Sequence, residues 1–186
     1  ESLSDQLSAL ADTILAAALP CAWTDMPKKH RDTPQFAIIG YGKLGGKELS
    51  YSSDLDLVYL YDDPHPDAGD VYSRLARRLT NWLSAATGAG SLYETDLRLR
   101  PNGDAGFLAH SIAAFEKYQR ESAWTWEHQA LVRARCVAGD EALRLQPRQQ
   151  LCEGKRLRQI IIGAGFQAFD FLFHLVERCQ HQNRRH

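Results

Sequence analysis

Residues 36–62 read FAIIGYGKLGGKELSYSSDLDLVYLYD, and this stretch decides the fold. The apolar run Phe36–Gly40 predicts a short strand that ends in a glycine turn. A helical turn is expected around Lys47–Leu49. The run Asp54–Tyr61 alternates at first and then becomes continuously apolar, which is typical of a central strand. The stretch therefore predicts two strands of one sheet, joined through the glycine turn.

Helical periodicity and capping residues predict helices on both sides of this stretch. They are expected at Ser4–Leu19, limited by Pro20, at the amphipathic Val71–Ala86, at Ser111–Arg120 and at Ala123–Val137. Ser91–Leu99 alternates and predicts a further strand, while residues 21–34 and 62–69 have the composition of loops. Trp124 and Trp126 are expected to be packing anchors rather than a base-stacking platform. This order predicts an α/β or α+β core with appended helices.

The composition indicates an ordinary soluble globular protein, with 44% hydrophobic and 24% charged residues among 186. A net charge of −1 provides no overall basic field for nucleic acid, although a local basic patch is compatible with it. The four cysteines form no CxxC pair, so we expect reduced thiols in a cytoplasmic protein. We expect no membrane span, because no apolar run approaches the roughly 20 residues that a span needs. The acidic start excludes a signal peptide, and the missing initiator methionine indicates a fragment of a longer chain.

Three aspartates form the candidate catalytic site. Asp54 and Asp56 project from the same side of their strand, roughly 6.5 Å apart along the chain, because side chains alternate between faces. Two such carboxylates repel each other, and a hard cation such as Mg²⁺ relieves the repulsion. Asp96 is the natural third ligand. The same alternation puts Arg98 and Arg100 on its face, where their guanidinium groups can bind phosphate oxygens.

The glycine turn at residues 40–46 lies upstream of the acid pair. Glycines allow the backbone amides to approach a phosphate, and Lys43 and Lys47 add positive charge. Phosphoryl or nucleotidyl transfer requires metal ligands together with positively charged side chains that bind the phosphates, and this stretch contains both. Taken singly, each acid is more often a loop, cap or ion-pair residue, and the glycines can form a simple turn. Their combination in this order favours the catalytic interpretation.

A dinucleotide-binding fold is the main rival interpretation. Gly40, Gly42 and Gly45 match GxGxxG after a strand, and Asp62 follows at roughly the spacing of a ribose-binding acid. Such a fold needs an unbroken helix before the second strand, and the intervening residues 50–53 (SYSS) are poor helix formers. A Walker A loop is excluded because Lys47 is followed by glutamate and the upstream glycine is absent.

Three long blocks closely resemble one known family. They read GYGKLGGKELSYSSDLDLVYLYD, YETDLRLRPNGDAG and AWTWEHQALVRAR, and they occur between Phe36 and Asp140. They are similar to the bifunctional glutamine synthetase adenylyltransferase/adenylyl-removing enzymes. The resemblance implies an α+β fold with a polymerase-β-like nucleotidyltransferase core, that is, a small mixed sheet with flanking helices and appended helices. The implied domains are an N-terminal helix and linker (1–35), a catalytic domain (36–140) and a helical tail (141–186) that departs from the family pattern.

The resemblance also implies the residues of the site. Mg²⁺ is expected on Asp54, Asp56 and Asp96, with ATP as the nucleotide substrate. The residues expected to bind the nucleotide are Gly40, Gly42, Lys43, Ser53, Arg98 and Arg100. Ser53 stands where the family has the serine of a Gly-Ser turn, and Ser52 replaces the glycine.

The implied reaction is transfer of AMP from ATP to a tyrosine of glutamine synthetase, which regulates nitrogen assimilation. Asp96 is a candidate acceptor of the tyrosine proton. Glutamine synthetase and, through the full-length enzyme, the PII nitrogen-signalling protein are the expected partners. The residues of these blocks are more similar to the adenylylating, C-terminal half of the enzyme. The alternatives are the phosphorolytic adenylyl-removing half, a catalytically silent docking fragment, and a dinucleotide-binding oxidoreductase.

Overall fold

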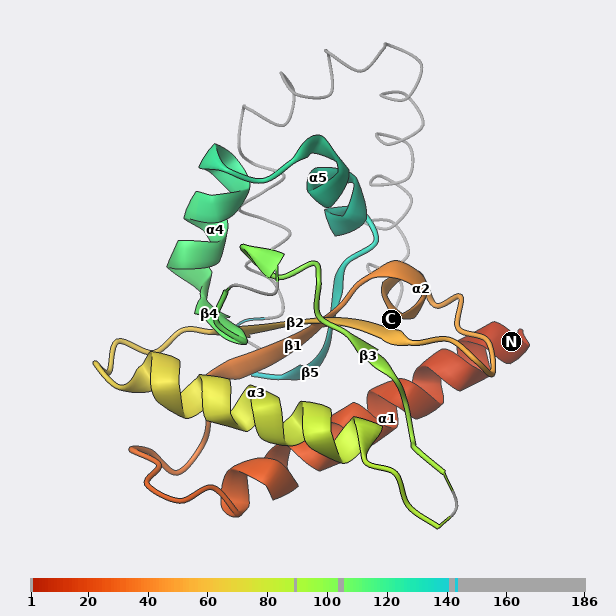
Figure 1. Ribbon diagram of the computed structural model, residues 1–186, viewed down its shortest axis with the longest axis horizontal. Coiled ribbons are helices and arrows are strands. Elements are labelled where there is room, and N and C mark those ends of the chain that lie inside the picture. Colours follow the sequence, from red (N-terminus) through yellow and green to blue (C-terminus); the bar gives the residue numbers. More distant parts are fainter. Residues whose placement is uncertain (1, 89, 104–105, 141–142, 144–186) are drawn as a thin grey trace, which may run out of the picture. The chain divides into compact units, whose positions relative to one another are not determined.

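The computed structural model describes residues 2–88, 90–103, 106–140 and 143. Their elements, in chain order, are α1 (Leu3–Thr24), β1 (Phe36–Gly40), α2 (Gly42–Gly46), β2 (Leu55–Tyr61), α3 (Ala68–Ser84), β3 (Thr95–Asp96), β4 (Ala109–Ser111), α4 (Ile112–Glu121), α5 (Thr125–Leu131) and β5 (Arg135–Gly139). Within this part of the chain, the strands form one mixed sheet with helices on both sides (Figure 1). The α+β class expected from the sequence is confirmed.

The glycine turn joins two antiparallel strands. β1 pairs antiparallel with β2, with Phe36 opposite Tyr61 and Gly40 opposite Leu57. β5 pairs antiparallel with the other edge of β1, whereas β3 and β4 both run parallel to β2. A dinucleotide-binding unit needs two parallel strands joined by a crossover helix. The antiparallel pairing therefore shows that the oxidoreductase alternative is wrong.

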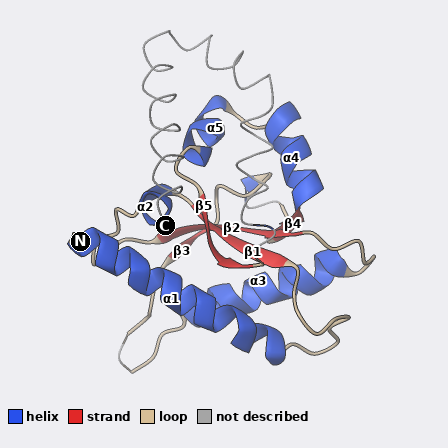
Figure 2. Cartoon of the chain, turned by 180° about the vertical axis from the view of Figure 1, so that it is seen from behind, coloured by secondary structure: helices blue, strands red, loops and turns tan. Residues whose placement is uncertain are grey.

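Alternation along the central strands divides the core into two layers. Phe36 and Ile38 of β1 lie in the cluster that contains the buried residues of α1 and α3. Ala37 and Ile39 point to the opposite face and pack in the cluster that contains Phe115 of α4. Figure 2 shows α1 and α3 on one side of the sheet and α4 and α5 on the other. Both faces of β1 are buried, which explains why its sequence is continuously apolar.

The first helix extends further than the sequence predicts. α1 continues through Pro20 to Thr24, so the expected limit at Pro20 and the loop from residue 21 are wrong. Proline removes one helical hydrogen bond. Leu19 and Trp23 are nevertheless buried on either side of it, and the Trp23 indole donates to the Asp32 carbonyl at 2.8 Å. Packing in the core therefore outweighs the local cost of the proline.

By length and composition alone, α1 could cross a bilayer, and it is the one such helix among the described residues. The expectation that no apolar run approaches that length is wrong here. The physical reason is that α1 supplies one layer of the core, where Ala11, Leu15 and Ala22 are completely buried. Asp12, on the same helix, forms a two-pronged ion pair with Arg135 of β5 at 2.7 and 2.8 Å.

Several local predictions differ from the structure. The helical turn occupies Gly42–Gly46 rather than Lys47–Leu49, because Lys47 adopts a left-handed conformation (φ 58°) and ends the helix. The strand expected over Ser91–Leu99 is limited to Thr95–Asp96. The helix expected over Ala123–Val137 ends at Leu131, and the last three residues of that range belong to β5. The helix after Ser111 is confirmed, with the Ser111 hydroxyl accepting from the Ala114 amide.

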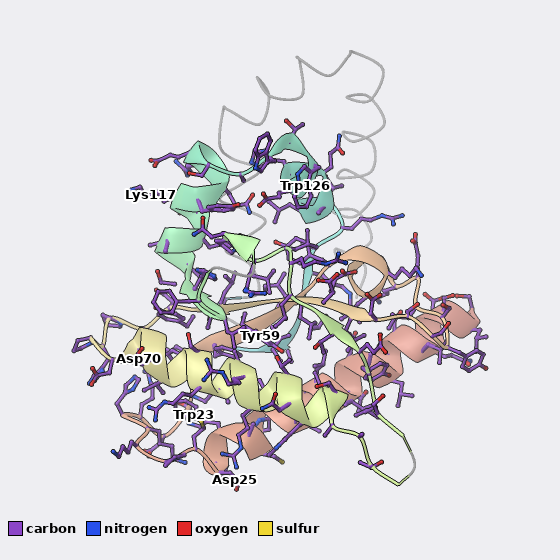
Figure 3. The ribbon with its side chains drawn as sticks, viewed as in Figure 1. Trp23, Asp25, Tyr59, Asp70, Lys117 and Trp126 are labelled. Atoms are coloured by element: carbon purple, nitrogen blue, oxygen red, sulfur yellow. The ribbon has the colours of Figure 1, made fainter. Side chains whose placement is uncertain are left out.

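The tryptophans of α5 are not packing anchors. Trp124 and Trp126 are 70% and 53% exposed, so that expectation is wrong. Figure 3 shows Trp126 on α5, on the opposite side of the sheet from Trp23. Of the four cysteines, Cys21 and Cys136 are free thiols, whereas Cys152 and Cys179 lie outside the described residues. The expected tail also lies outside them, except for the buried Leu143.

A buried ion-pair network fixes the end of β2. The Asp63 side chain is only 4% exposed and accepts hydrogen bonds from Arg31 and from the Tyr72 hydroxyl, both at 2.8 Å. It also contacts His30 Nε2 at 2.8 Å and accepts from the His65 amide. Burial alone disfavours the ionised carboxylate, but these hydrogen bonds outweigh it and hold the pKa of Asp63 well below its usual range.

Replacing Asp63 should therefore reduce stability in a pH-dependent way. Asp63→Asn is expected to lower the free energy of unfolding by about 2–4 kcal/mol at pH 7, because it leaves buried donors beside a neutral amide. The folded-state pKa is depressed, so the contribution is present above the unfolded value of about 3.9 and is lost as the pH falls further. Urea titrations across this range measure the difference between the two proteins. Asp62→Asn, on the exposed neighbour, is the control, and equal losses in the two variants would contradict the assignment.

Candidate metal and nucleotide site

Three carboxylates converge where β2 begins. Asp54 precedes β2, Asp56 lies within it, and the parallel register places Asp96 of β3 beside Asp56. One carboxylate oxygen from each of the three lies within 4.8 Å of the others. Leu55 and Leu57 belong to the core cluster under α1 and α3, so Asp56 between them points to the opposite face of the sheet. The structure thus brings together the three acids that the sequence selects.

The three acids differ in their electrostatic environment. The pKa of Asp56 is raised, first by burial and then by the negative charges of Asp54 and Asp96. The pKa of Asp96 is lowered, chiefly because Arg98 donates to its side chain. A cluster in which like charges oppose the ionisation of one member is suited to a divalent cation, and oxygen donors are the ligands that Mg²⁺ prefers. The residues present therefore fit a metal site.

Arg98 and Arg100 occupy different places, contrary to the expectation that they share the face of Asp96. Arg98 Nε donates to both carboxylate oxygens of Asp96, at 2.8 and 3.0 Å, and the Arg98 amide donates to one of them. Arg100 is buried and donates from Nη1 to the Leu97 carbonyl. The strand ends at Asp96 and the chain turns at Leu97, so the alternation does not continue. Of these two arginines, Arg98 is therefore the one that hydrogen-bonds to an acid of the cluster.

The glycine turn passes directly beside Asp56. The Tyr41 amide donates to the Asp56 carbonyl at 2.9 Å, and Gly42 follows with a φ of +51°. A Cβ at Gly42 would lie 2.1 Å from Asp56 Oδ2, so no other residue fits without displacing that carboxylate. Gly40 is closely packed as well, because a Cβ there would approach Leu44 and Val137 within 2.9 Å.

The two remaining candidate nucleotide-binding residues, Lys43 and Ser53, differ in exposure and in their contacts. Lys43 is exposed on α2, and its positive charge favours the ionised form of Asp56. Ser53 is buried, and its hydroxyl accepts from the Ser50 amide at 3.0 Å and pairs with the Ser50 hydroxyl at 2.8 Å. Ser53 thus closes the turn that leads into Asp54. Its proposed contact with the triphosphate stays a prediction.

Sequence reasoning missed the residues that anchor α2. Gly45 packs so closely on the Arg133 carbonyl that a Cβ would lie 2.1 Å from that oxygen. The Arg133 side chain pairs with Glu48 at 2.9 Å, and Arg135 donates to the Leu44 carbonyl at 3.0 Å. The only signal in the sequence is the Arg-Ala-Arg run at 133–135, and alternation there would have indicated a strand. These contacts fix the glycine turn against β5.

Comparisons with known proteins identify the family of this chain. A family model described as glutamate-ammonia ligase adenylyltransferase matches residues 1–150. The chain belongs to this family. The match extends the resemblance beyond Phe36–Asp140 to include the N-terminal helix, and residues 151–186 lie outside it.

Members of the glutamate-ammonia ligase adenylyltransferase family from several bacteria are very similar to this chain. The bifunctional glutamine synthetase adenylyltransferase/adenylyl-removing enzyme of Neisseria meningitidis serogroup B is 91% identical over 139 residues, which are 75% of this chain and 16% of that protein. The enzyme of the same name from Chromobacterium violaceum is 65% identical over 143 residues, 77% of this chain and 16% of its own length. The chain therefore spans about one sixth of the length of these curated relatives.

The contact between Gly42 and Asp56 leads to a direct test. Gly42→Ala is expected to weaken Mn²⁺ binding roughly 10–100-fold, because the new Cβ displaces one of three ligands. The left-handed conformation should cost a further 1–2 kcal/mol of stability, roughly, for a residue with a Cβ. Mn²⁺ titration followed by electron paramagnetic resonance measures the affinity. Gly46→Ala is the matched control, since its nearest neighbour would be 3.5 Å away. Equal Mn²⁺ affinities in the two variants would show that Gly42 has no influence on metal binding.

Proposed function

We propose that this domain transfers AMP from ATP to a tyrosine of glutamine synthetase, and that Asp54, Asp56 and Asp96 hold Mg²⁺ for this reaction. The observation that carries the proposal is the convergence of the three carboxylates beside the glycine turn. Membership of the family supports the choice of protein substrate. A small mixed sheet that carries the acids at the start of β2 and on the neighbouring β3 also supports a polymerase-β-like nucleotidyltransferase fold.

The reaction replaces a phosphoanhydride bond of ATP with a phosphate ester bond to tyrosine. The tyrosine oxygen forms a bond to the α-phosphorus of ATP, the bond from that phosphorus to the bridging oxygen breaks, and pyrophosphate leaves with the bonding electrons. A bound divalent cation supplies Lewis-acid stabilisation of the phosphate charge in such transfers. In this chain the backbone of the Gly42 turn lies beside the Asp56 carboxylate, so it is the natural contact for the triphosphate.

Two cations of the chain are suited to the phosphate oxygens. Lys43 extends from α2, next to the glycine turn, and is exposed. Arg98 is 78% exposed, and its guanidinium group pairs with the Asp96 carboxylate. A guanidinium group binds phosphate in the same two-pronged manner as it binds carboxylate. Arg98 can therefore exchange Asp96 for a phosphate group when nucleotide is present.

The state of Asp96 decides whether it can accept the tyrosine proton. While Arg98 is bound, the pKa of Asp96 lies below its usual range, which makes the carboxylate a weak base. Movement of Arg98 onto a phosphate removes this influence and strengthens the base. Arg98 thereby couples nucleotide binding to proton transfer. Arg100, which is buried in the turn, supports the local structure and acts on Asp96 through its charge alone.

The proposal extends to the setting of the reaction. We further propose that the longer enzyme acts in the cytoplasm and that the PII nitrogen-signalling protein is its regulatory partner, as the resemblance to the family implies. Removal of AMP by phosphorolysis is the second candidate activity, because the relatives' names include both adenylylation and adenylyl removal. The same acid cluster would serve either reaction, since both exchange bonds at the α-phosphorus.

Label transfer from [α-³²P]ATP to glutamine synthetase tests the proposal. In the presence of Mg²⁺ the wild-type chain should label the protein, whereas Asp54→Asn and Asp56→Asn should reduce the rate at least about 1,000-fold, as expected when a metal ligand is lost. Asp62→Asn, at an exposed position just after β2, should keep the wild-type rate.

Supplying phosphate and adenylylated glutamine synthetase distinguishes the two activities. Release of ADP under these conditions, without labelling of the unmodified protein, identifies the removing half and overturns the adenylylating assignment. Binding of glutamine synthetase without either turnover identifies a silent docking domain. Equal activity in Asp54→Asn and Asp62→Asn dismisses the metal site.

A further inference from the structure

The exposed side of α3 carries a basic stripe that the proposed reaction does not use. Arg77 and Arg78 follow Arg74 by three and four residues, and Asn81 follows them by four and three, so the four side chains lie on one face of the helix. Leu75 and the other apolar residues of α3 point to the core instead. Because α3 covers the sheet face opposite to that of Asp56, this stripe lies away from the three acids (Figure 1).

The arginines of the stripe form few hydrogen bonds and ion pairs with the described residues. Arg78 contacts Asp25 at 3.7 Å and lies over the Trp82 ring at 5.5 Å. Arg74 makes one long hydrogen bond, at 3.4 Å, to a carbonyl in its own helix. Within the described part of the chain, neither Arg74 nor Arg77 forms an ion pair. Two guanidinium groups on adjacent turns are thus available to an external acceptor.

Two grooves meet at this stripe. The larger has a volume of about 470 Å³ and is lined by Arg74 and Arg77 together with Lys28, His65 and Phe107. The second, of about 310 Å³, lies further along α3 and is lined by Arg74, Arg77, Arg78, Asn81 and Trp82. The same two arginines therefore border both grooves. Phe107, 69% exposed, and Trp82, 40% exposed, add apolar surface beside the charges.

We propose that the α3 stripe is a docking surface for an acidic segment of a partner protein. Charge complementarity decides the partner, since the unpaired Arg74 and Arg77 require carboxylates. Arginine and tryptophan are the residue types that contribute most at protein–protein contacts, and both are present here. Grooves that continue along a helix fit an extended peptide segment that places successive acidic side chains on successive arginines.

The surroundings of the stripe favour a protein over a nucleic acid. Asp25, Asp67 and Asp70 lie beside the arginines, as Figure 3 shows for Asp25 and Asp70 near α1 and α3. A continuous phosphate backbone would pass these carboxylates and be repelled by them. A peptide can instead present its charges only where the arginines are. The surface is thus a local basic patch on a chain whose net charge is −1.

Fluorescence anisotropy with a labelled oligo-glutamate peptide tests the proposal. The wild-type chain should bind this peptide at low ionic strength and release it as salt is added, because exposed ion pairs are screened. Arg74→Glu combined with Arg77→Glu is expected to weaken binding about tenfold or more, given two lost pairs and two new repulsions. Lys117→Glu combined with Arg120→Glu makes the same charge change on α4, across the sheet, and should leave the affinity within about twofold.

The outcomes are distinct. Equal weakening by the two double variants, or binding that is insensitive to salt, overturns the proposal. So does tighter binding of an oligothymidylate that depends on Arg74 and Arg77, because that result identifies a nucleic-acid surface. Thermal unfolding of both double variants checks that they fold. If the α3 variant does not fold, Arg77→Gln alone serves, with an expected loss of about threefold.

Discussion

Gly40 of β1 pairs with Leu57 of β2, so the chain leaving β1 runs directly past the carboxyl group of Asp56. The backbone hydrogen bond from Tyr41 to Asp56 fixes that approach, and the missing side chain of Gly42 leaves the space that the carboxylate fills. On the other side, Gly45 rests on the Arg133 carbonyl. The glycine turn is therefore held between an acid of β2 and the backbone before β5. Neither glycine serves flexibility here, because each allows a close contact that fixes the position of the turn.

The acids add an electrostatic constraint to this geometry. Three carboxylates within 4.8 Å of one another cannot all be ionised at low cost without a nearby positive charge. Arg98 offsets the charge of Asp96, while Asp56 remains exposed to the repulsion of both neighbours. The cluster is thus uneven, with one acid stabilised as an anion and one destabilised. Perturbed acids that share one site with a cation are a feature of functional sites.

Local patterns predicted the parts of this structure that depend on local interactions. β1, β2, α3 and α4 follow from periodicity and capping, and the alternation of Asp54 and Asp56 identified two of the three acids. β5 was not predicted, because its residues also fit a helical pattern and become a strand only by pairing with β1, about 100 residues earlier. Arg100 was placed with Asp96 because the sequence continues to alternate after the chain has turned at Leu97. Pairing of β2 with β3 and the contacts of α2 with β5 are equally non-local, so a pattern could suggest the acids but not the contacts that support them.

The ion pair between Asp12 and Arg135 joins positions 123 residues apart. Ribosomes add roughly 5–20 residues per second, so α1 leaves the exit tunnel roughly 6–25 s before the arginine that locks it to the sheet. During that interval, the newly made chain presents a helix apolar enough to enter a bilayer, with its partners still incomplete. Among the described helices, α1 therefore waits longest for the strand that completes its packing.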